Sequence, residues 1–142
     1  MITRRHQVSA SAESEYAADV ALAAQFDDLL EKARESEQVY RKAQAQSLRD
    51  EELYPLARNL DDALTSAMRA AYAAQRSEID PRGYEDWIYR RKAKAKSAVH
   101  AWTDEAERLL TLRETHRLTG TPPAPRTDLP GGGVTHVPAV GI

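Results

Sequence analysis

A chain of 142 residues, of which 42% are hydrophobic, can bury one modest core and is too short for two independent ones. Its formal net charge of -2, with 30% charged residues, gives no reason by itself to expect a polyanionic partner. The sequence has no cysteine, which excludes disulfide and thiolate chemistry, and it has no long apolar run or apolar leader, so we expect a cytoplasmic protein without a membrane span.

The first predicted element is a long helix that follows a flexible arm at residues 1–10. Ser11 is a suitable N-cap, and Glu13 and Asp19 lie in the first turns, where the helix dipole favours acids. Apolar or small residues then recur at the alternating spacings of four and three that a heptad seam requires. These residues are Leu22, Phe26, Leu29, Ala33, Ser36, Tyr40 and Ala43. Nothing interrupts the pattern before Asp50, so we expect one helix of about 40 residues.

A turn or kink is predicted at Tyr54–Pro55, because proline removes a backbone hydrogen bond and disfavours the helical conformation of the residue before it. A second, shorter helix of about 24 residues then runs to near Ser77, with Leu60 and Leu64 in its apolar stripe. The two outer helices would overhang this middle helix by about 15 residues, or roughly 20 Å. We expect the uncovered stripe to seek a partner.

The third predicted helix begins at Asp80–Pro81, a pair typical of an N-cap and first helical position, and it ends near Leu118, before Gly120. Its apolar face includes Trp87, Ile88, Trp102 and Leu109. Residues 119–142 are rich in proline and glycine and read as an extended tail. The tail ends in an apolar run that could dock on a partner or remain slack, with Val134, Val137, Val140 and Ile142 as candidate docking residues.

These elements predict an all-α protein, arranged as a three-helix antiparallel bundle or a coiled-coil-like assembly of long, shorter and long helices. The helical domain would span residues 11–118 and carry the extended Pro/Gly-rich tail. The candidate helix seam comprises Leu22, Phe26, Leu29, Tyr40, Leu60, Leu64, Trp87, Ile88, Trp102 and Leu109.

A basic cluster on the third helix is the sharpest local feature of the sequence. It comprises Arg90, Arg91, Lys92, Lys94 and Lys96. Basic clusters beside aromatic residues can bind nucleic acid. At 100° per residue, however, four of the cations flank the apolar stripe and Arg91 points into it, so pairing with Asp19, Asp27 and Asp28 of a parallel first helix is the favoured interpretation.

Motifs for catalysis, cofactors and metals are absent from the sequence. There is no Glu-x-x-His pair, Walker loop or dinucleotide fingerprint, and Gly131–Gly133 has no strand or helix around it. The four histidines, including His100 and His116, are expected at the surface. We therefore expect no enzyme activity, cofactor, metal or small-molecule substrate.

The function predicted from these features is that of a structural or assembly subunit, acting through helix packing and the tail in a homo-oligomer or with other protein subunits. A large particle such as a phage virion would suit this role. The alternative is a nucleic-acid-associated helical protein that uses the basic cluster.

Overall fold

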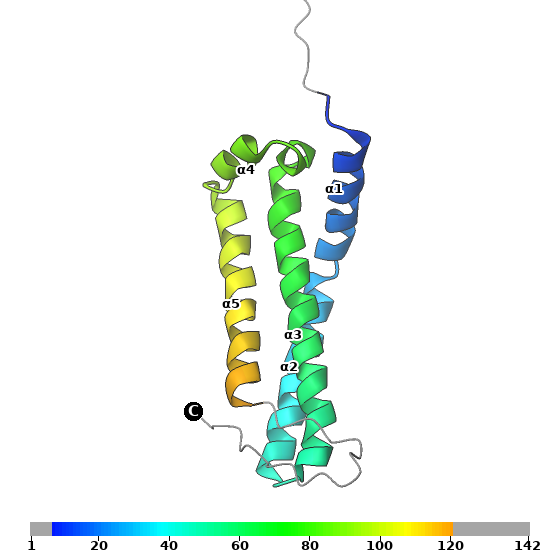
Figure 1. The fold of residues 1–142 in the computed structure, drawn as a ribbon, viewed down its shortest axis with the longest axis vertical. Helices are drawn as coiled ribbons and strands as arrows, with labels where there is room; N and C mark the ends of the chain where they lie inside the picture. Colours follow the sequence, from blue (N-terminus) through cyan, green and yellow to red (C-terminus); the bar gives the residue numbers. More distant parts are fainter. Residues whose placement is uncertain (1–6, 121–142) are drawn as a thin grey trace, which may run out of the picture.

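A computed structural model describes residues 7–120, and every regular element in this part of the chain is helical (Figure 1). The elements are α1 (Ala10–Ala23), α2 (Phe26–Ala45), α3 (Asp50–Ile79), the 3₁₀ helix η1 (Pro81–Tyr84), α4 (Trp87–Ala93) and α5 (Ser97–Thr119). The predicted all-α class is confirmed for the described residues. The predicted tail at 119–142 begins with Thr119, which is in fact the last residue of α5, and its residues 121–142 lie outside the described range, as does most of the arm.

Helix α3 lies at the centre and contacts α1, α2 and α5. Figure 1 shows α1 and α2 following each other along one side of α3, with α5 along the other side. Hydrogen bonds join Gln75 to Thr103 and Arg117 to Asp61. Because the residue number falls along α3 as it rises along α5 from one pair to the next, these two helices run antiparallel.

The core depends on the small residues of α3, because alanines let neighbouring helices approach from both sides. Ala57, Ala67, Ala70 and Ala71 have no exposed surface. Large side chains then meet from α2 and α5, where an edge-to-face contact joins Phe26 to Trp102 with ring centroids 5.1 Å apart. The single phenylalanine and one of the two tryptophans are thus used where α2 and α5 meet.

The first predicted helix is in fact two helices, and it begins earlier than expected. Ser9, not Ser11, is the N-cap of α1, because its Oγ accepts a hydrogen bond from the Ala12 N–H at 3.1 Å. The break falls at Ala24–Gln25, where the Gln25 N–H bonds to the Leu22 carbonyl, three residues back. Both residues keep right-handed helical angles, so α2 continues in nearly the same direction.

The chain reverses before Pro55, at residues 46–49, so the predicted turn at Tyr54–Pro55 is wrong. Helix α2 ends in a Schellman motif, in which the Leu48 N–H bonds to the Ala43 carbonyl and the Ser47 N–H to the Gln44 carbonyl. Ser47 takes the left-handed conformation, with φ of 54°, that glycine usually takes at this position. A sequence search for glycine therefore misses this turn.

Pro55 lies inside α3, in its second turn, where its missing N–H leaves the Glu51 carbonyl without its helical donor. With 30 residues, α3 is the longest helix in the described part of the chain, and α5 has 23. The predicted order of long, shorter and long helices is therefore wrong, and within residues 7–120 the outer helices do not extend past the middle helix by the expected 15 residues or so.

The third predicted helix is divided into η1, α4 and α5. Asp80 does act as a cap, because its Oδ1 accepts the Arg82 N–H at 2.9 Å, but it caps η1. The predicted end is confirmed, since the Gly120 N–H bonds to the His116 carbonyl at 2.8 Å. Between them α4 lies at the end of the molecule, beside the ends of α3 and α5 (Figure 1).

Candidate functional site

Helix α4 is short, and contacts on one side hold it in place. Its N-cap is Asp86, whose Oδ1 accepts the Tyr89 N–H at 3.0 Å. Ala93 is buried in a small cluster with Ile79 and Val99, and the half-buried Tyr89 packs against that cluster. The Tyr89 hydroxyl also donates to Asp80 at 2.5 Å. The side of α4 that carries Tyr89 and Ala93 therefore faces the body.

The opposite side of α4 carries Trp87 and Ile88, whose exposed fractions are 61% and 54%. Both were predicted in the helix seam, and both predictions are wrong. Arg91 was predicted on the apolar face, either buried with a partner or emerging at an open stretch of the seam, and it is exposed. The error has a physical origin, because the turn at residues 94–96 separates α4 from α5 and changes the helical phase that the sequence pattern assumed continuous.

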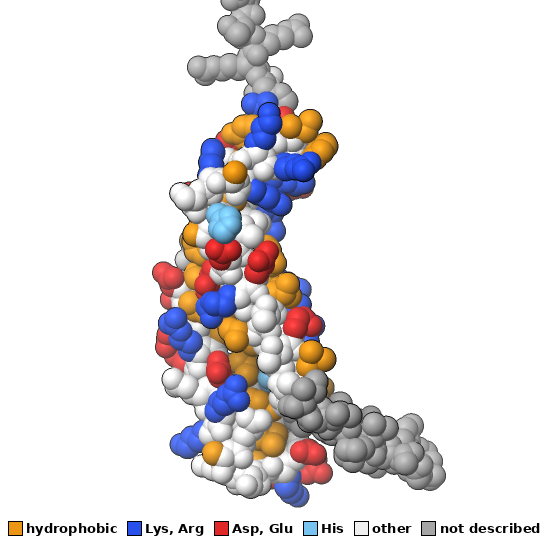
Figure 2. Space-filling view, turned by 90° about the vertical axis from the view of Figure 1, so that its left-hand side faces the viewer, with side chains coloured by type: hydrophobic (Ala, Val, Ile, Leu, Met, Phe, Trp, Pro, Cys, Tyr) orange, Lys and Arg blue, Asp and Glu red, His pale blue; other side chains and the backbone are white. Residues whose placement is uncertain are grey.

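All five cations of the basic cluster are exposed, and none forms an ion pair with any residue in the described range 7–120. Arg90, Arg91 and Lys94 follow Trp87 by three, four and seven residues, which places them on one helical face. Figure 2 shows Lys and Arg side chains gathered at this end of the molecule, with hydrophobic side chains beside them. We call this surface the α4 tip, defined by Trp87, Ile88, Arg90, Arg91, Lys92, Lys94 and Lys96.

The acids predicted to neutralise the basic cluster are placed elsewhere. Asp19 binds Arg76 of α3 through two hydrogen bonds of 2.8 and 3.0 Å. Asp27 and Asp28 are exposed in the first turn of α2. The predicted pairing of the cluster with these three acids is therefore wrong. The two acids directly before α4 are also engaged, since Glu85 accepts the Ser9 N–H at 3.3 Å and Asp86 pairs with Arg82 at 3.4 Å.

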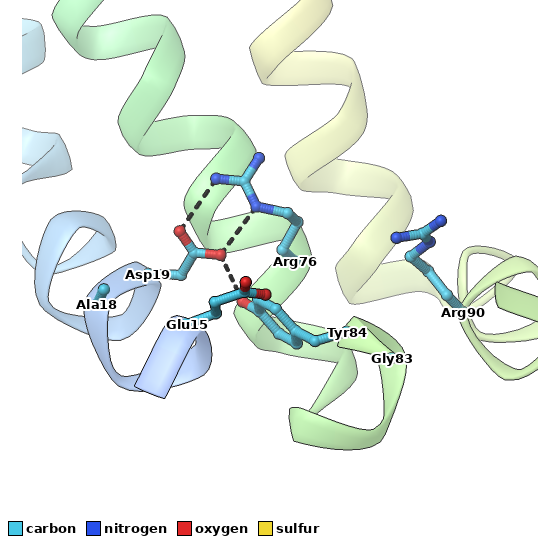
Figure 3. A pocket seen from close by; sticks show the side chains of 7 residues that line it. All are labelled: Glu15, Ala18, Asp19, Arg76, Gly83, Tyr84 and Arg90. Atoms are coloured by element: carbon cyan, nitrogen blue, oxygen red, sulfur yellow. Dashed lines mark hydrogen bonds and ion pairs between the residues drawn. The ribbon is translucent and has the colours of Figure 1, made fainter. Parts of the chain in front are cut away.

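A pocket of about 340 Å³ adjoins the α4 tip (Figure 3). Its lining residues are Glu15, Ala18, Asp19, Arg76, Gly83, Tyr84 and Arg90. Within it, Asp19 accepts hydrogen bonds from Arg76 and, at 2.5 Å, from the Tyr84 hydroxyl. Arg90 stands apart from these three bonded groups. The pocket is thus lined both by the hydrogen-bonded group of Asp19, Arg76 and Tyr84 and by Arg90 of the basic cluster.

The protonation states in this network suit a structural role. Burial opposes the charge on Asp19, but the hydrogen bonds from Arg76 and Tyr84 outweigh it and lower the pKa of the carboxyl. Burial, together with the hydrogen bond to Asp19, raises the pKa of the Tyr84 hydroxyl. Asp19 therefore remains charged and Tyr84 neutral, and the network fastens α1 to α3 and η1.

The two histidines of α5 have opposite environments. His100 is exposed, as predicted, and lies 3.1 Å from Asp104. His116 was predicted at the surface but is only 8% exposed, with its Nε2 lying 2.8 Å from the Ala57 carbonyl oxygen. Its ring also meets Tyr40 edge to face, at 5.3 Å between centroids. Among residues 7–120, no group of three or more His, Cys, Asp or Glu side chains is placed to hold a metal ion.

The other seam residues are placed as predicted. Five of them are buried, namely Phe26, Tyr40, Leu60, Leu64 and Leu109, and three are partly buried, namely Leu22, Leu29 and Trp102. The tail docking candidates Val134, Val137, Val140 and Ile142 lie outside the described residues. Sequence reasoning missed His116, although it follows the buried Leu109 by seven residues and so continues the heptad seam. No local signal marks Arg76 or Tyr84 as partners of Asp19, which lies far away in the sequence.

Comparison with protein-family models, with curated proteins and with solved structures found no match to this chain. None of the helices in residues 7–120 has both the length and the apolar character that crossing a membrane requires.

Proposed function

We propose that this chain is a non-enzymatic, nucleic-acid-associated protein, in which an antiparallel three-helix bundle supports the α4 tip. The observation that carries the proposal is that five clustered cations are exposed without an ion pair to any described residue. Like charges at helical neighbour positions repel one another and destabilise the helix that carries them. An external polyanion would relieve that repulsion.

The arrangement of α4 supports an outward role for these cations. Tyr89 and Ala93 anchor the inner side of the helix, which leaves Arg91 and Lys94 directed away from the core. Several other exposed arginines pair with acids, such as Arg76 with Asp19 and Arg117 with Asp61, whereas Arg58 and Arg69 have no ion pair to a described residue but lie singly and not in a cluster. The sequence alone favoured pairing of the cluster with acids, and the observed pairing of Asp19 with Arg76 removes the ground for that preference.

A charge-reversal experiment tests the proposal. The variant Arg91→Glu/Lys94→Glu should weaken binding to labelled DNA more than tenfold. The control Lys32→Glu/Lys42→Glu makes the same change of charge on exposed sites of α2 and should weaken binding less. If the wild-type protein contacts three to five phosphates, raising the salt from about 50 to 200 mM should weaken its binding roughly 20- to 500-fold. Equal effects of the two variants, or no salt-sensitive binding, would contradict the proposal.

A second candidate function is the predicted structural or assembly subunit, in a homo-oligomer or a particle such as a phage virion. A hollow of about 130 Å³ between α2 and α5 supports it, with Tyr40, Leu60, Leu64, Leu112 and His116 among its lining residues. Leu112 is 40% exposed there. An apolar side chain of another subunit could cover it. Light scattering tests this proposal, since Leu112→Glu should reduce the native mass of any assembly built on the hollow.

A further inference from the structure

We infer that the α4 tip binds single-stranded nucleic acid, with Trp87 stacking on an unpaired base while Arg90, Arg91 and Lys94 contact neighbouring phosphates. This inference rests on the proposed function and specifies its substrate class. It is carried by the combination of an exposed indole and exposed cations on the same helical face. The cations alone would not distinguish single strands from duplexes.

The indole is presented on a fixed backbone. Trp87 is the first residue of α4, directly after the Asp86 cap, and its exposed fraction is 61%. Arg91 lies one turn further along the same face, with Arg90 beside it and Lys94 at the far end. Seven residues of helix span about 10 Å, so the ring and the cations form one compact surface. Ile88 extends its apolar part, with an exposed fraction of 54%.

Stacking requires a free π-face, and this requirement selects the class of nucleic acid. In a duplex the bases cover one another's faces, whereas unpaired bases can stack on aromatic side chains. Proteins that bind single strands combine such aromatic residues with a cationic path for the phosphates. The α4 tip carries both elements. Of the two acids before α4, Asp86 pairs with Arg82, which offsets its charge, whereas Glu85 accepts the neutral Ser9 N–H and keeps its charge.

The phosphate path has a natural continuation beyond α4. Lys96 is the N-cap of α5, and with Lys94 it lies in the turn between the two helices. Arg90 borders the pocket on the other side of the tip. Positive charge therefore continues from Arg91 through Lys94 to Lys96, a path that a short segment of single strand could follow from the ring, whereas the carboxylates of Glu15 and Asp19 line the pocket beside Arg90.

Fluorescence of Trp87 provides a direct test. The chain has two tryptophans, so Trp102→Phe leaves Trp87 as the only one. This variant is titrated with a thymidine oligonucleotide of about 12 nucleotides, within the site sizes of about 4 to 16 nucleotides known for single-strand binding folds. Stacking should quench the emission, and a mixed-sequence duplex of the same length should quench it less and bind more weakly. Circular dichroism checks that the variant keeps its helices.

A second set of variants keeps Trp102 and so does not depend on a changed core. Binding of the labelled oligonucleotide should weaken about 5- to 150-fold in Trp87→Ala, the range expected for loss of one base–aromatic stack. Trp87→Phe should retain most of the affinity because it keeps a π-face. Trp87→Leu, which is apolar without a π-face, should resemble the alanine variant. Trp87 is exposed, so all three variants should melt like wild type.

The outcomes separate the substrate class from the proposed function. Equal binding of duplex and single strand, with no loss in Trp87→Ala, would overturn the single-strand inference and leave nucleic-acid binding intact. Absence of salt-sensitive binding to either form would overturn both. Binding to phosphatidylserine vesicles without binding to either nucleic acid would also overturn both, and would assign the tip to an anionic membrane surface.

Discussion

Asp19 of α1 and Arg76 of α3 are 57 positions apart in the chain, and their side chains meet through two hydrogen bonds of 2.8 and 3.0 Å. The carboxylate side chain is only 14% exposed, whereas the guanidinium is 43% exposed. The Tyr84 hydroxyl adds a third bond to the same carboxylate. One acid therefore joins α1 to the last turns of α3 and to η1, in the pocket that Arg90 of the α4 tip also lines.

Replacing Asp19 should weaken this junction. We expect Asp19→Asn to lower the free energy of unfolding by about 1 to 2 kcal/mol, because it removes the charge that strengthens the bonds from Arg76 and Tyr84 while keeping the shape. Urea denaturation at neutral pH measures the change. Asp27→Asn is the matched control, since Asp27 is exposed on α2 and should change stability by less than about 0.5 kcal/mol. Equal effects of the two variants would contradict the assigned role of Asp19.

The same acid makes stability depend on pH. The pKa of Asp19 is lowered, as is the pKa of Asp61, chiefly through its hydrogen bond from Arg117. Because the folded-state pKa lies below the unfolded-state value, each group stabilises the fold fully above a pH of about 4 and loses this contribution as the pH falls through its folded-state pKa. The difference in unfolding free energy between wild type and Asp19→Asn/Asp61→Asn should therefore be largest at neutral pH and shrink towards pH 2 or so. A constant difference in denaturation series across this range would refute the linkage.

The two histidines of α5 should respond differently to the same substitution. His116→Leu removes the hydrogen bond to the Ala57 carbonyl and the edge contact with Tyr40, so we expect a loss of about 1 to 3 kcal/mol. His100→Leu changes an exposed residue and should shift stability by less than about 0.5 kcal/mol. Thermal denaturation of both variants measures the contrast. If His116 lay at the surface, as the sequence suggested, the two variants would lose the same small amount of stability.

The turn between α2 and α3 should tolerate glycine better than serine. Ser47 has φ of 54°, a conformation that costs an L-residue energy and costs glycine little. We expect Ser47→Gly to raise the free energy of unfolding by about 0.5 to 1 kcal/mol, after allowing for the greater entropy of glycine in the unfolded chain. Ser47→Ala is the control and should not stabilise. If both variants were equally stable, the left-handed conformation would not be the cause.

The sequence by itself determined the helical class, the residues of the main core and the C-terminal cap. Phe26, Leu60 and Leu109 follow a heptad period, and that period depends only on the geometry of a single helix. Gly120 follows the last residue of α5, as the sequence predicted, although its φ of -115° is one that any residue can adopt. The heptad period could also have predicted the burial of His116, but a histidine in an apolar position is easily read as a surface residue.

Only the tertiary structure decided where the helices break and which way α4 faces. The Schellman turn carries Ser47 in place of glycine, and Pro55 is accommodated inside α3, so local signals pointed to the wrong turn. The phase of α4 depends on how Tyr89 and Ala93 pack against Ile79 and Val99, and such contacts join residues that a helical period cannot relate across a turn. The same packing exposes Trp87 and leaves the basic cluster without an ion pair to any residue in the described part of the chain. The candidate site therefore follows from side-chain packing between elements, which a one-dimensional pattern does not contain.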